Sequence, residues 1–366
     1  MPRPTTTTTT VTRAASHAGS WYTDDKARLD AQLATWLEAT ANPQHGEPLK
    51  QAPIQGCKAI IAPHAGYSYS GPAAAFAYRC IDVQNIHRVF VLGPSHHVYL
   101  DGCALSRCTV YDTPIGKLPL DLDTIRELKE TGKFQDMDQE TDEDEHSIEM
   151  HLPYIRKVFE GRDIKIVPIL VGSISHSSEQ AYGALLAPYL ADPGTVFVVS
   201  SDFCHWGTRF RYTHYHPPES DDLAAGTTLT ANNFAQIVPK DAGRGSASAV
   251  WQAISKLDHL GMEAISFLTS TGDDDGDDGK TAARAHEEFA AYLARTKNTI
   301  CGRHPIGVLL AALAALETSR RSQQHGSPPA AMRCEWVRYE QSSHVERLTD
   351  SSVSYASAFV AIDPSL

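Results

Sequence analysis

Uninterrupted apolar runs recur along the chain and predict the strands of a buried sheet. They are AIIA at 59–62, VFVL at 89–92, IKIVPILV at 164–171 and VFVVS at 196–200. Runs of this kind, rich in β-branched residues and without polar alternation, are typical of strands that are covered on both faces of a parallel sheet. Each run is short and ends near a proline, glycine or serine, which is where we expect the chain to turn.

Segments with helical periodicity separate these runs, for example 121–130, 178–190 and 282–295. The repeated order strand, helix, strand predicts right-handed βαβ crossovers. We therefore expect an α/β fold with a central, largely parallel or mixed sheet flanked by helices. The last two strands, at 335–341 and 353–362, alternate in part and predict an antiparallel edge.

The expected domain organisation is simple. Residues 1–13 form a threonine-rich tail with little to bury, and we expect them to be disordered. Residues 14–366 are predicted to form one domain, with surface inserts near 217–248 and 271–280. The second insert is rich in aspartate and glycine, but it lacks the ligand pattern of an EF-hand loop, so we interpret it as a solvated loop.

Composition narrows the classes of function. The 366 residues include 32 Lys and Arg against 44 Asp and Glu, a formal charge of −12. This charge argues against nucleic acid and anionic lipid surfaces as partners. No apolar run is long enough for a membrane span and the N-terminus lacks a secretory h-region, so we expect a cytoplasmic protein, with the nucleus as a further compartment. Seven cysteines without a CxxC pair are interpreted as reduced thiols.

Histidines follow the predicted strands at their carboxyl ends. His64 comes just after the first run, and His96 and His97 follow the second. Because ligands bind in the crevice at the carboxyl ends of strands in open α/β sheets, the pair of strands indicates a metal or catalytic site. Each histidine taken alone is equally well explained as a hydrogen-bonded loop residue. Asp202 and His205, after the 196–200 run, are expected at the same edge.

Other candidate residues lie further from these strands in the sequence. His146 and Glu149 are spaced i, i+3 in a segment that an acidic block opens, so they share a helix face and are expected in a second shell or facing a substrate. His17 could face the same cleft or be structural. Cys301 lies in a glycine-flanked turn before an apolar helix, where backbone N–H groups are expected to stabilise its thiolate.

Seven motifs, in order along the chain, carry a family resemblance. They are ASHAGSWYT, APHAGY, LGPSHH, TDEDEHSIEMHLPY, VSSDFCHWG, TICGRHPIGV and SSVSYA. With these motifs the sequence resembles the MEMO family (mediator of ErbB2-driven cell motility), which includes proteins like component B of the AmmeMemoRadiSam system. The resemblance runs from residue 14 onward. It implies a fold similar to that of the class III extradiol dioxygenases, which are non-heme iron enzymes.

The resemblance also implies a site and a role. It implies one metal ion held by His64, His96 and Cys301, with Asp202 and His205 beside it. Two imidazoles and a thiolate suit iron(II), copper or zinc and exclude magnesium and calcium. We expect iron or copper rather than zinc, a monomer, and a redox role linked to cell signalling or motility. His205 would act as acid or base, and Asp202 would orient a ligand or be one itself. His97 would support the metal ligands or face a substrate.

Two further interpretations stay open at this point. A cysteine in place of the carboxylate of the dioxygenase pattern makes ring cleavage an unsafe inference, so the chain could be a signalling adaptor that binds peptides in a vestigial cleft. Animal members of the family are expected to bind phosphotyrosine peptides, and Arg209 and Arg211 could pair with a phosphate, although both could be ordinary surface arginines. Hydrolase chemistry is disfavoured because neither GxSxG nor HExxH is present.

Overall fold

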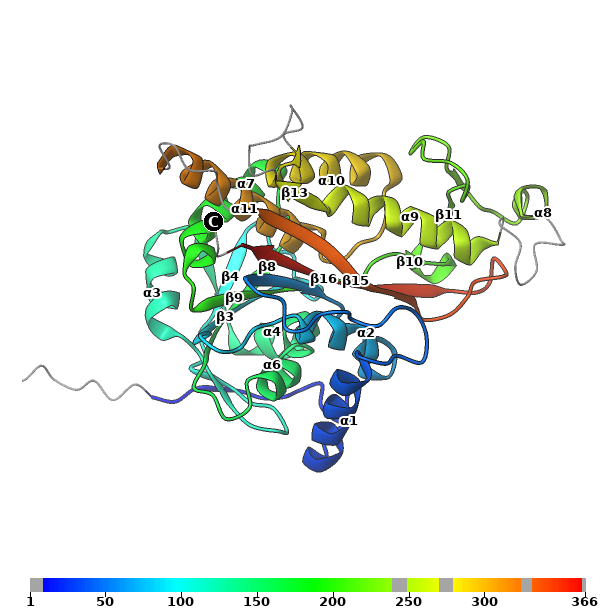
Figure 1. The fold of residues 1–366 in the computed structure, drawn as a ribbon. Coiled ribbons are helices and arrows are strands. Elements are labelled where there is room, and N and C mark those ends of the chain that lie inside the picture. The colour runs from blue at the N-terminus through cyan, green and yellow to red at the C-terminus, as the bar shows by residue number, and fades with distance from the viewer. Residues whose placement is uncertain (1–8, 239–248, 270–278, 324–330, 364–366) are drawn as a thin grey trace, which may run out of the picture.

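The computed structural model describes residues 9–238, 249–269, 279–323 and 331–363, and its largest feature is an 11-stranded sheet (Figure 1). The order across the sheet is β14-β13-β15-β16-β2-β9-β3-β8-β4-β7, with β10 paired to one end of β16. The strands are β2 (Cys57–Ala62), β3 (Arg88–Pro94), β4 (Cys103–Ser106), β7 (Phe134–Met137), β8 (Lys165–Val171), β9 (Thr195–Ser200), β10 (His205–Trp206), β13 (Phe267–Thr269), β14 (Gly279–Lys280), β15 (Met332–Gln341) and β16 (Ser352–Ile362).

The centre of the sheet is parallel and its flanks are mixed. Strands β2, β9, β3 and β8 run parallel, whereas β4 is antiparallel to β8 and β16 is antiparallel to β2. The predicted α/β class with a largely parallel, mixed sheet is therefore confirmed. The predicted antiparallel pairing of the last two strands is also confirmed, but β16 is not an edge strand. It lies between β15 and β2, and β13 and β14 extend the sheet beyond β15. β16 is buried along its whole length.

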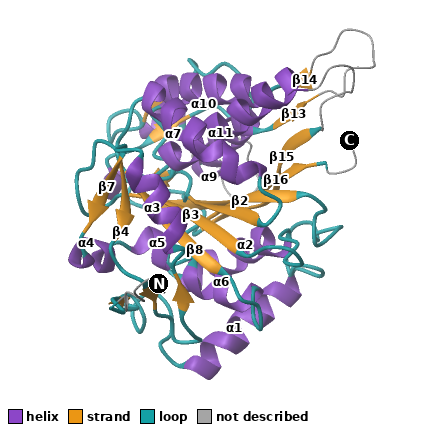
Figure 2. Cartoon of the chain, turned by 90° about the vertical axis from the view of Figure 1, so that its left-hand side faces the viewer, coloured by secondary structure: helices purple, strands orange, loops and turns teal. Residues whose placement is uncertain are grey.

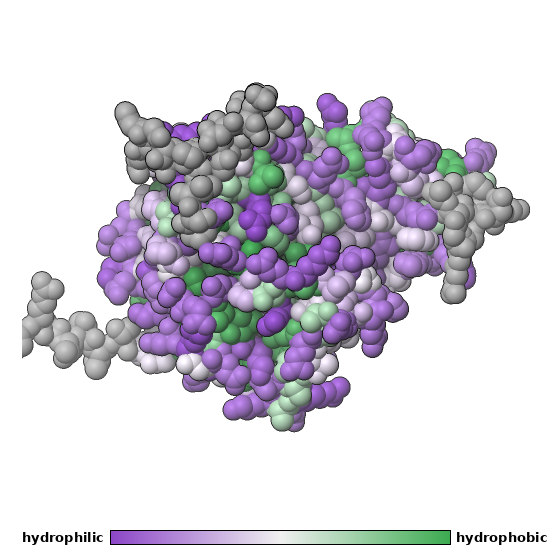
Figure 3. All heavy atoms as spheres, in the orientation of Figure 1, coloured by the Kyte–Doolittle hydropathy of each residue, from purple (hydrophilic) through white to green (hydrophobic). Residues whose placement is uncertain are grey.

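Helices cover both faces of the sheet, as Figures 1 and 2 show. One layer holds α1 (Lys26–Ala39), α2 (Tyr67–Arg79), α5 (His146–Glu149) and α6 (Leu152–Val158). The other holds α7 (His176–Ala191), α9 (Val250–Ile265), α10 (Ala282–Thr296) and α11 (Arg303–Gln323). The remaining helices are α3 (Leu122–Glu130), α4 (Gln139–Asp144), α8 (Phe234–Ile237) and a 3-10 turn (Thr208–Phe210). On the face in Figure 3, hydrophilic residues dominate the periphery.

The N-terminal segment is better ordered than the sequence predicted. Thr12 and Arg13 form β1, which pairs with β5 (Val110–Tyr111), and β5 pairs in turn with β6 (Leu118–Pro119). Arg13 is fully buried and makes ion pairs with Asp142 and Glu149. The prediction of a disordered tail through residue 13 is therefore wrong for these two residues, because a buried guanidinium needs fixed carboxylate partners. Residues 1–8 lie outside the described part of the chain.

The two predicted inserts are only partly described. Within 217–238, β12 (Thr227–Thr228) pairs with β11 (His214–Tyr215) and most side chains are exposed or half-buried. Residues 239–248 of the first insert and 270–278 of the second lie outside the described residues. In the part of the chain that is described, no helix is both long enough and apolar enough to cross a membrane.

Candidate metal centre

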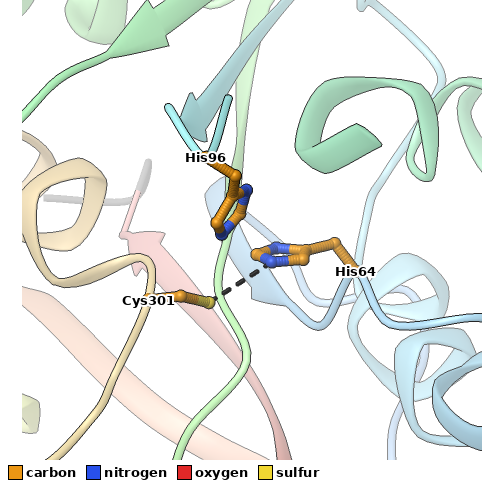
Figure 4. Close-up of side chains that lie close together, drawn as sticks. All are labelled: His64, His96 and Cys301. Atoms are coloured by element: carbon orange, nitrogen blue, oxygen red, sulfur yellow. Dashed lines mark hydrogen bonds between the residues drawn. The ribbon is translucent and has the colours of Figure 1, made fainter. Parts of the chain in front are cut away.

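Two imidazoles and a sulfur converge at the carboxyl edge of the parallel strands (Figure 4). His64 follows β2, His96 follows β3, and Cys301 lies in the turn before α11. One donor atom from each lies within 4.8 Å of the other two, and the Cys301 Sγ is 3.3 Å from the His64 Nε2. β2 and β3 are not adjacent in the sheet, because β9 lies between them.

The ring orientation of His64 is fixed by the end of β9. Its Nδ1 is 2.6 Å from the Ser200 hydroxyl oxygen, and that hydroxyl donates to the Ser147 carbonyl at 2.8 Å. Because the hydroxyl hydrogen is used there, the Nδ1 of His64 is the donor, and its Nε2 keeps a free lone pair toward Cys301. Burial, followed by the neighbouring histidines, holds the pKa of His64 well below its usual value. His64 is therefore a neutral imidazole in the form that binds metals.

His96 is held by a buried carboxylate that our sequence analysis missed. Glu145 accepts from the His96 backbone N–H at 2.7 Å and lies 3.0 Å from the His96 Nδ1. Burial tends to raise the pKa of Glu145, but the hydrogen bonds from His96 outweigh it and lower this pKa to about 2. The ionised carboxylate makes Nδ1 the donor and leaves Nε2 free, which is the arrangement that typically orients a metal-binding histidine.

Glu145 is also part of a second metal-capable group. His96, Glu145 and His146 present one donor atom each within 4.8 Å. The carboxylate is already satisfied, however, since it accepts from the Ser147 backbone N–H at 2.9 Å in addition to both contacts from His96. We therefore interpret it as an anchor for His96 rather than as a ligand. The available signal in the sequence was its position directly before His146, where it also caps α5.

The Cys301 sulfur is protonated more firmly than the sequence suggested. Burial and then the charge of Asp202 raise the pKa of the thiol well above its usual value, although backbone hydrogen bonds from Asp202 and Gly302 act in the opposite direction. The expectation of a thiolate stabilised by the helix terminus alone is therefore wrong. A bound cation would reverse this balance, because coordination deprotonates a thiol. Cys301 is half-buried, whereas the other six cysteines are buried.

Asp202 and His205 frame the three donors without joining them. Asp202 Oδ1 accepts from the backbone N–H of His64 at 2.8 Å, and Oδ2 is 4.0 Å from the His64 Nε2. The carboxylate therefore fixes the turn that presents His64. The Nδ1 of His205 lies 2.9 Å from the Phe203 carbonyl and 3.1 Å from the Thr299 carbonyl, so Nδ1 is the donor to these two oxygens.

The His146 ring packs beside His96. The two rings stack with centroids 4.5 Å apart, and Trp21 packs against the His146 ring at 4.3 Å. Burial, followed by the charge of His96, lowers the pKa of His146 to about 3, so its ring is neutral. His97 is exposed and meets His146 edge-on at 5.9 Å. The His146 ring therefore lies against His96, while His97 contacts its edge from an exposed position.

Glu149 and His17 hold the N-terminal segment next to the His146 ring. Glu149 is fully buried and accepts hydrogen bonds from Arg13 at 2.7 Å, Tyr22 at 2.8 Å and the backbone of His17 at 2.9 Å. The His17 Nδ1 also lies 2.9 Å from the carboxylate. His17 is 6.0 Å from the His146 ring, so it backs that ring rather than the metal donors. Glu149 therefore fixes Arg13, His17 and Tyr22 and is not one of the three donors.

Comparison with known proteins identifies the family of this chain. A family model described as "Memo-like protein" matches residues 13–359. The chain belongs to the Memo-like family. Protein MEMO1 of Danio rerio is 42% identical over 354 residues, covering 96% of this chain and 98% of the relative, and Protein MEMO1 of Homo sapiens is 41% identical with the same coverage. The resemblance read from the seven motifs is confirmed.

A solved structure is similar at a lower level. The crystal structure of uncharacterized protein JW3007 from Escherichia coli K12 is 14% identical, with a TM-score of 0.36, over 82% of this chain and 99% of that chain. A TM-score of this size supports no fold assignment, so the fold of the Memo-like chain is assigned from its own sheet and helix layers.

Proposed function

We propose that this Memo-like protein binds one iron(II) or copper ion through His64, His96 and Cys301 and has a redox role in cell signalling. The observation that carries the proposal is the convergence of two imidazoles, each with its Nδ1 held by a hydrogen-bond partner, and one sulfur within 4.8 Å. This mixed nitrogen and sulfur set suits iron(II), copper and zinc. Zinc is the less favoured ion because it would supply no electron transfer.

The surrounding residues have separate tasks in this proposal. A bound iron or copper ion would supply one-electron chemistry at the cleft. Ser200 and Glu145 hold the two rings so that Nε2 is the free nitrogen of each. His205 keeps its proton on Nδ1 against two carbonyls, and its Nε2 can accept a proton from a ligand in the cleft. Asp202 orients the first turn after β2. Ring cleavage is not part of the proposal.

The test measures the metal content of the purified protein and of two cysteine variants. We expect protein purified without oxygen to carry close to one iron or copper per chain. Cys301→Ser should lower the occupancy at least about tenfold, since removing even an outer-shell partner costs 10- to 100-fold. Substituting one of the six buried cysteines, as in Cys334→Ser, gives a matched control that should keep the ion. Wild-type protein that takes up neither iron(II) nor copper(I) would contradict the proposal.

A second candidate function rests on the turn that follows β10. Arg209 and Arg211 are exposed there, and neither makes an ion pair with a residue that the structure describes. The Arg209 guanidinium lies 4.4 Å above the Phe210 ring, and that ring meets His205 edge-on at 5.2 Å. Two unpaired guanidinium groups beside a cleft suit an anionic peptide such as a phosphotyrosine peptide. This adaptor role in the cytoplasm is compatible with metal binding.

Calorimetry with one peptide in phosphorylated and plain forms tests the adaptor role. We expect binding of the phosphorylated form only, with affinity at least about tenfold weaker in Arg209→Ala, since charge-assisted hydrogen bonds contribute roughly 1.5–3 kcal/mol. Arg107→Ala removes an exposed arginine elsewhere and serves as the control. Equal affinity for both peptide forms would count against a phosphate-reading cleft.

A further inference from the structure

A buried carboxylate links three helices on the face of the sheet opposite α2. Glu179 of α7 lies 2.7 Å from the His304 Nδ1 of α11 through one oxygen and 2.7 Å from the His286 Nε2 of α10 through the other. Glu179 and His286 are buried, and the His304 side chain is 18% exposed. Each imidazole donates to a separate carboxylate oxygen, so the acid sits between the rings and satisfies both.

The first two turns of α11 are shaped to receive this carboxylate. Gly307 lies one turn after His304, and a Cβ there would be 2.4 Å from the Glu179 carboxyl carbon. Only glycine lets the carboxylate approach so closely. The side chain of Glu179 therefore touches α11 at two successive turns, through His304 and across Gly307.

The turn before α11 is held from its other side by the end of β9. The backbone N–H of Gly302 donates to the Ser201 hydroxyl at 3.2 Å. A Cβ at Gly302 would lie 2.3 Å from the Ser200 carbonyl oxygen, so this residue also makes a close approach. Both attachments directly follow Cys301 in the chain, the first at Gly302 and the second at His304. They fix the backbone of the turn that carries the sulfur, and the sulfur itself accepts from the Asp202 backbone N–H at 3.2 Å and lies 3.4 Å from the Asp202 carbonyl oxygen.

Electrostatics makes the attachment through Glu179 a strong one. Burial tends to raise the pKa of Glu179, but the hydrogen bonds from His286 and His304 outweigh it and lower this pKa. The group is therefore an ionised carboxylate in a low-dielectric position with a donor on each oxygen. Removing the His304 donor would leave one oxygen of a buried charge without its partner, which is costly.

We propose that Glu179 and His304 are positioning residues that hold the Cys301 sulfur within metal-binding distance of the His64 imidazole. The part of this proposal that concerns metal affinity rests on the proposed function. The part that concerns the placement of the sulfur does not, because the 3.3 Å separation of Cys301 Sγ and His64 Nε2 is a contact between two side chains of the protein itself. The two parts are tested separately.

The first experiment titrates full-length protein with cobalt(II) and follows the thiolate-to-cobalt charge-transfer band. We expect His304→Ala and Glu179→Ala to weaken cobalt affinity 10- to 100-fold, the usual cost of losing an outer-shell partner, and to weaken the band per bound ion. His304→Asn can place an amide N–H near the position of Nδ1 and should restore both quantities to within about threefold. Such a rescue would not follow from a merely structural role of the imidazole.

A matched control lies on the same helix. Glu317 is a buried carboxylate near the other end of α11 that accepts from Arg321 at 2.8 Å. Glu317→Ala should leave the cobalt affinity and the charge-transfer band unchanged. If Glu179→Ala does not fold, the pair His304→Ala and His304→Asn carries the test alone. Unchanged affinity and an unchanged band in folded His304→Ala would overturn the proposal.

The second experiment needs no metal. Cys301 is the half-buried cysteine among six buried ones, so its alkylation by iodoacetamide can be timed by peptide mass spectrometry. We expect His304→Ala to change the rate about fivefold or more by releasing the turn, while Glu317→Ala keeps the wild-type rate. If wild-type protein binds none of cobalt(II), iron(II) and copper(I), the proposed function fails, and the alkylation rates still decide the placement of the sulfur. Equal rates in His304→Ala and wild type would refute it.

Discussion

Two clusters of histidines and acids in this protein differ in their capacity to bind a metal ion. In the cleft, the nitrogens of His64 and His96 converge with a sulfur, and the nearest acids bind their outer sides or the backbone. In the helix layer, Glu179 lies between His286 and His304 and uses one oxygen for each. The metal-capable groups found among the described residues include the first cluster and not the second.

The position of the carboxylate makes the difference. An acid behind a ring fixes the outer N–H and points the other nitrogen, with its lone pair, toward an open position. An acid between two rings takes a hydrogen from each and leaves no shared position for a cation. Counting histidines and acids in the sequence cannot separate these cases, because both clusters contain the same residue types. The first cluster is built to receive an ion and the second to join helices.

The largest expected effect is a difference in metal affinity between two variants that each lose one imidazole, His96→Ala and His286→Ala. His96→Ala deletes a donor of the cleft and should weaken iron(II) or copper(I) affinity by at least about a hundredfold, beyond the usual cost of an outer-shell change. His286→Ala deletes a ring of the helix layer and keeps the contact between Glu179 and His304, so the affinity should stay within about threefold. Competition with a coloured chelator measures both. Similar losses in the two variants would break the contrast between the clusters.

The next effect isolates the carboxylate behind His96. Glu145→Gln keeps the shape of the side chain but removes the charge that fixes the His96 Nδ1 proton, so metal affinity should fall 10- to 100-fold. Asp144→Asn changes the neighbouring exposed acid of the same block and is expected to have no effect. The same chelator competition applies. An unchanged affinity in Glu145→Gln would show that the backbone, and not this carboxylate, orients the ring.

The smallest effect concerns the buried histidine His151 and the dependence of folding stability on pH. Burial lowers the pKa of His151 to about 3 in the folded chain, while the unfolded value is near 6.5. Because the unfolded chain binds the extra proton below pH 6.5, folding stability should fall as the pH falls, by about 2 kcal/mol at pH 5 for this residue. Urea unfolding at pH 7 and pH 5 measures the loss, which we expect to be smaller by that amount in His151→Asn.

The control for this pH dependence is an exposed histidine. His45→Asn should show the same difference in unfolding free energy between pH 7 and pH 5 as the wild-type protein. In His151→Asn the substituted amide still offers a partner to the Tyr78 hydroxyl, which lies 2.8 Å from the His151 Nδ1. A pH dependence that is equal in all three proteins would mean that His151 does not titrate in this way.

The sequence by itself determined the parts that depend on neighbours along the chain. Apolar runs located β2, β3, β8 and β9, and the residues after them located His64, His96 and Asp202 at one edge. The turn that carries Cys301 before a buried helix was also readable, and the seven motifs indicated the family. These features follow from local hydrophobic period and from turn residues, which need no knowledge of distant contacts.

Only the tertiary structure decided which residues meet. In the folded chain β9 lies between β2 and β3, and Arg13 is buried beside Glu149. The carboxylate that contacts the His96 ring belongs to Glu145 and not to Glu149. Cys301 reaches His64 across 237 residues of sequence, and its thiol is protonated because of burial and the charge of Asp202. Strand order, burial and local charge are set by packing between distant segments, and no pattern within one segment specifies them.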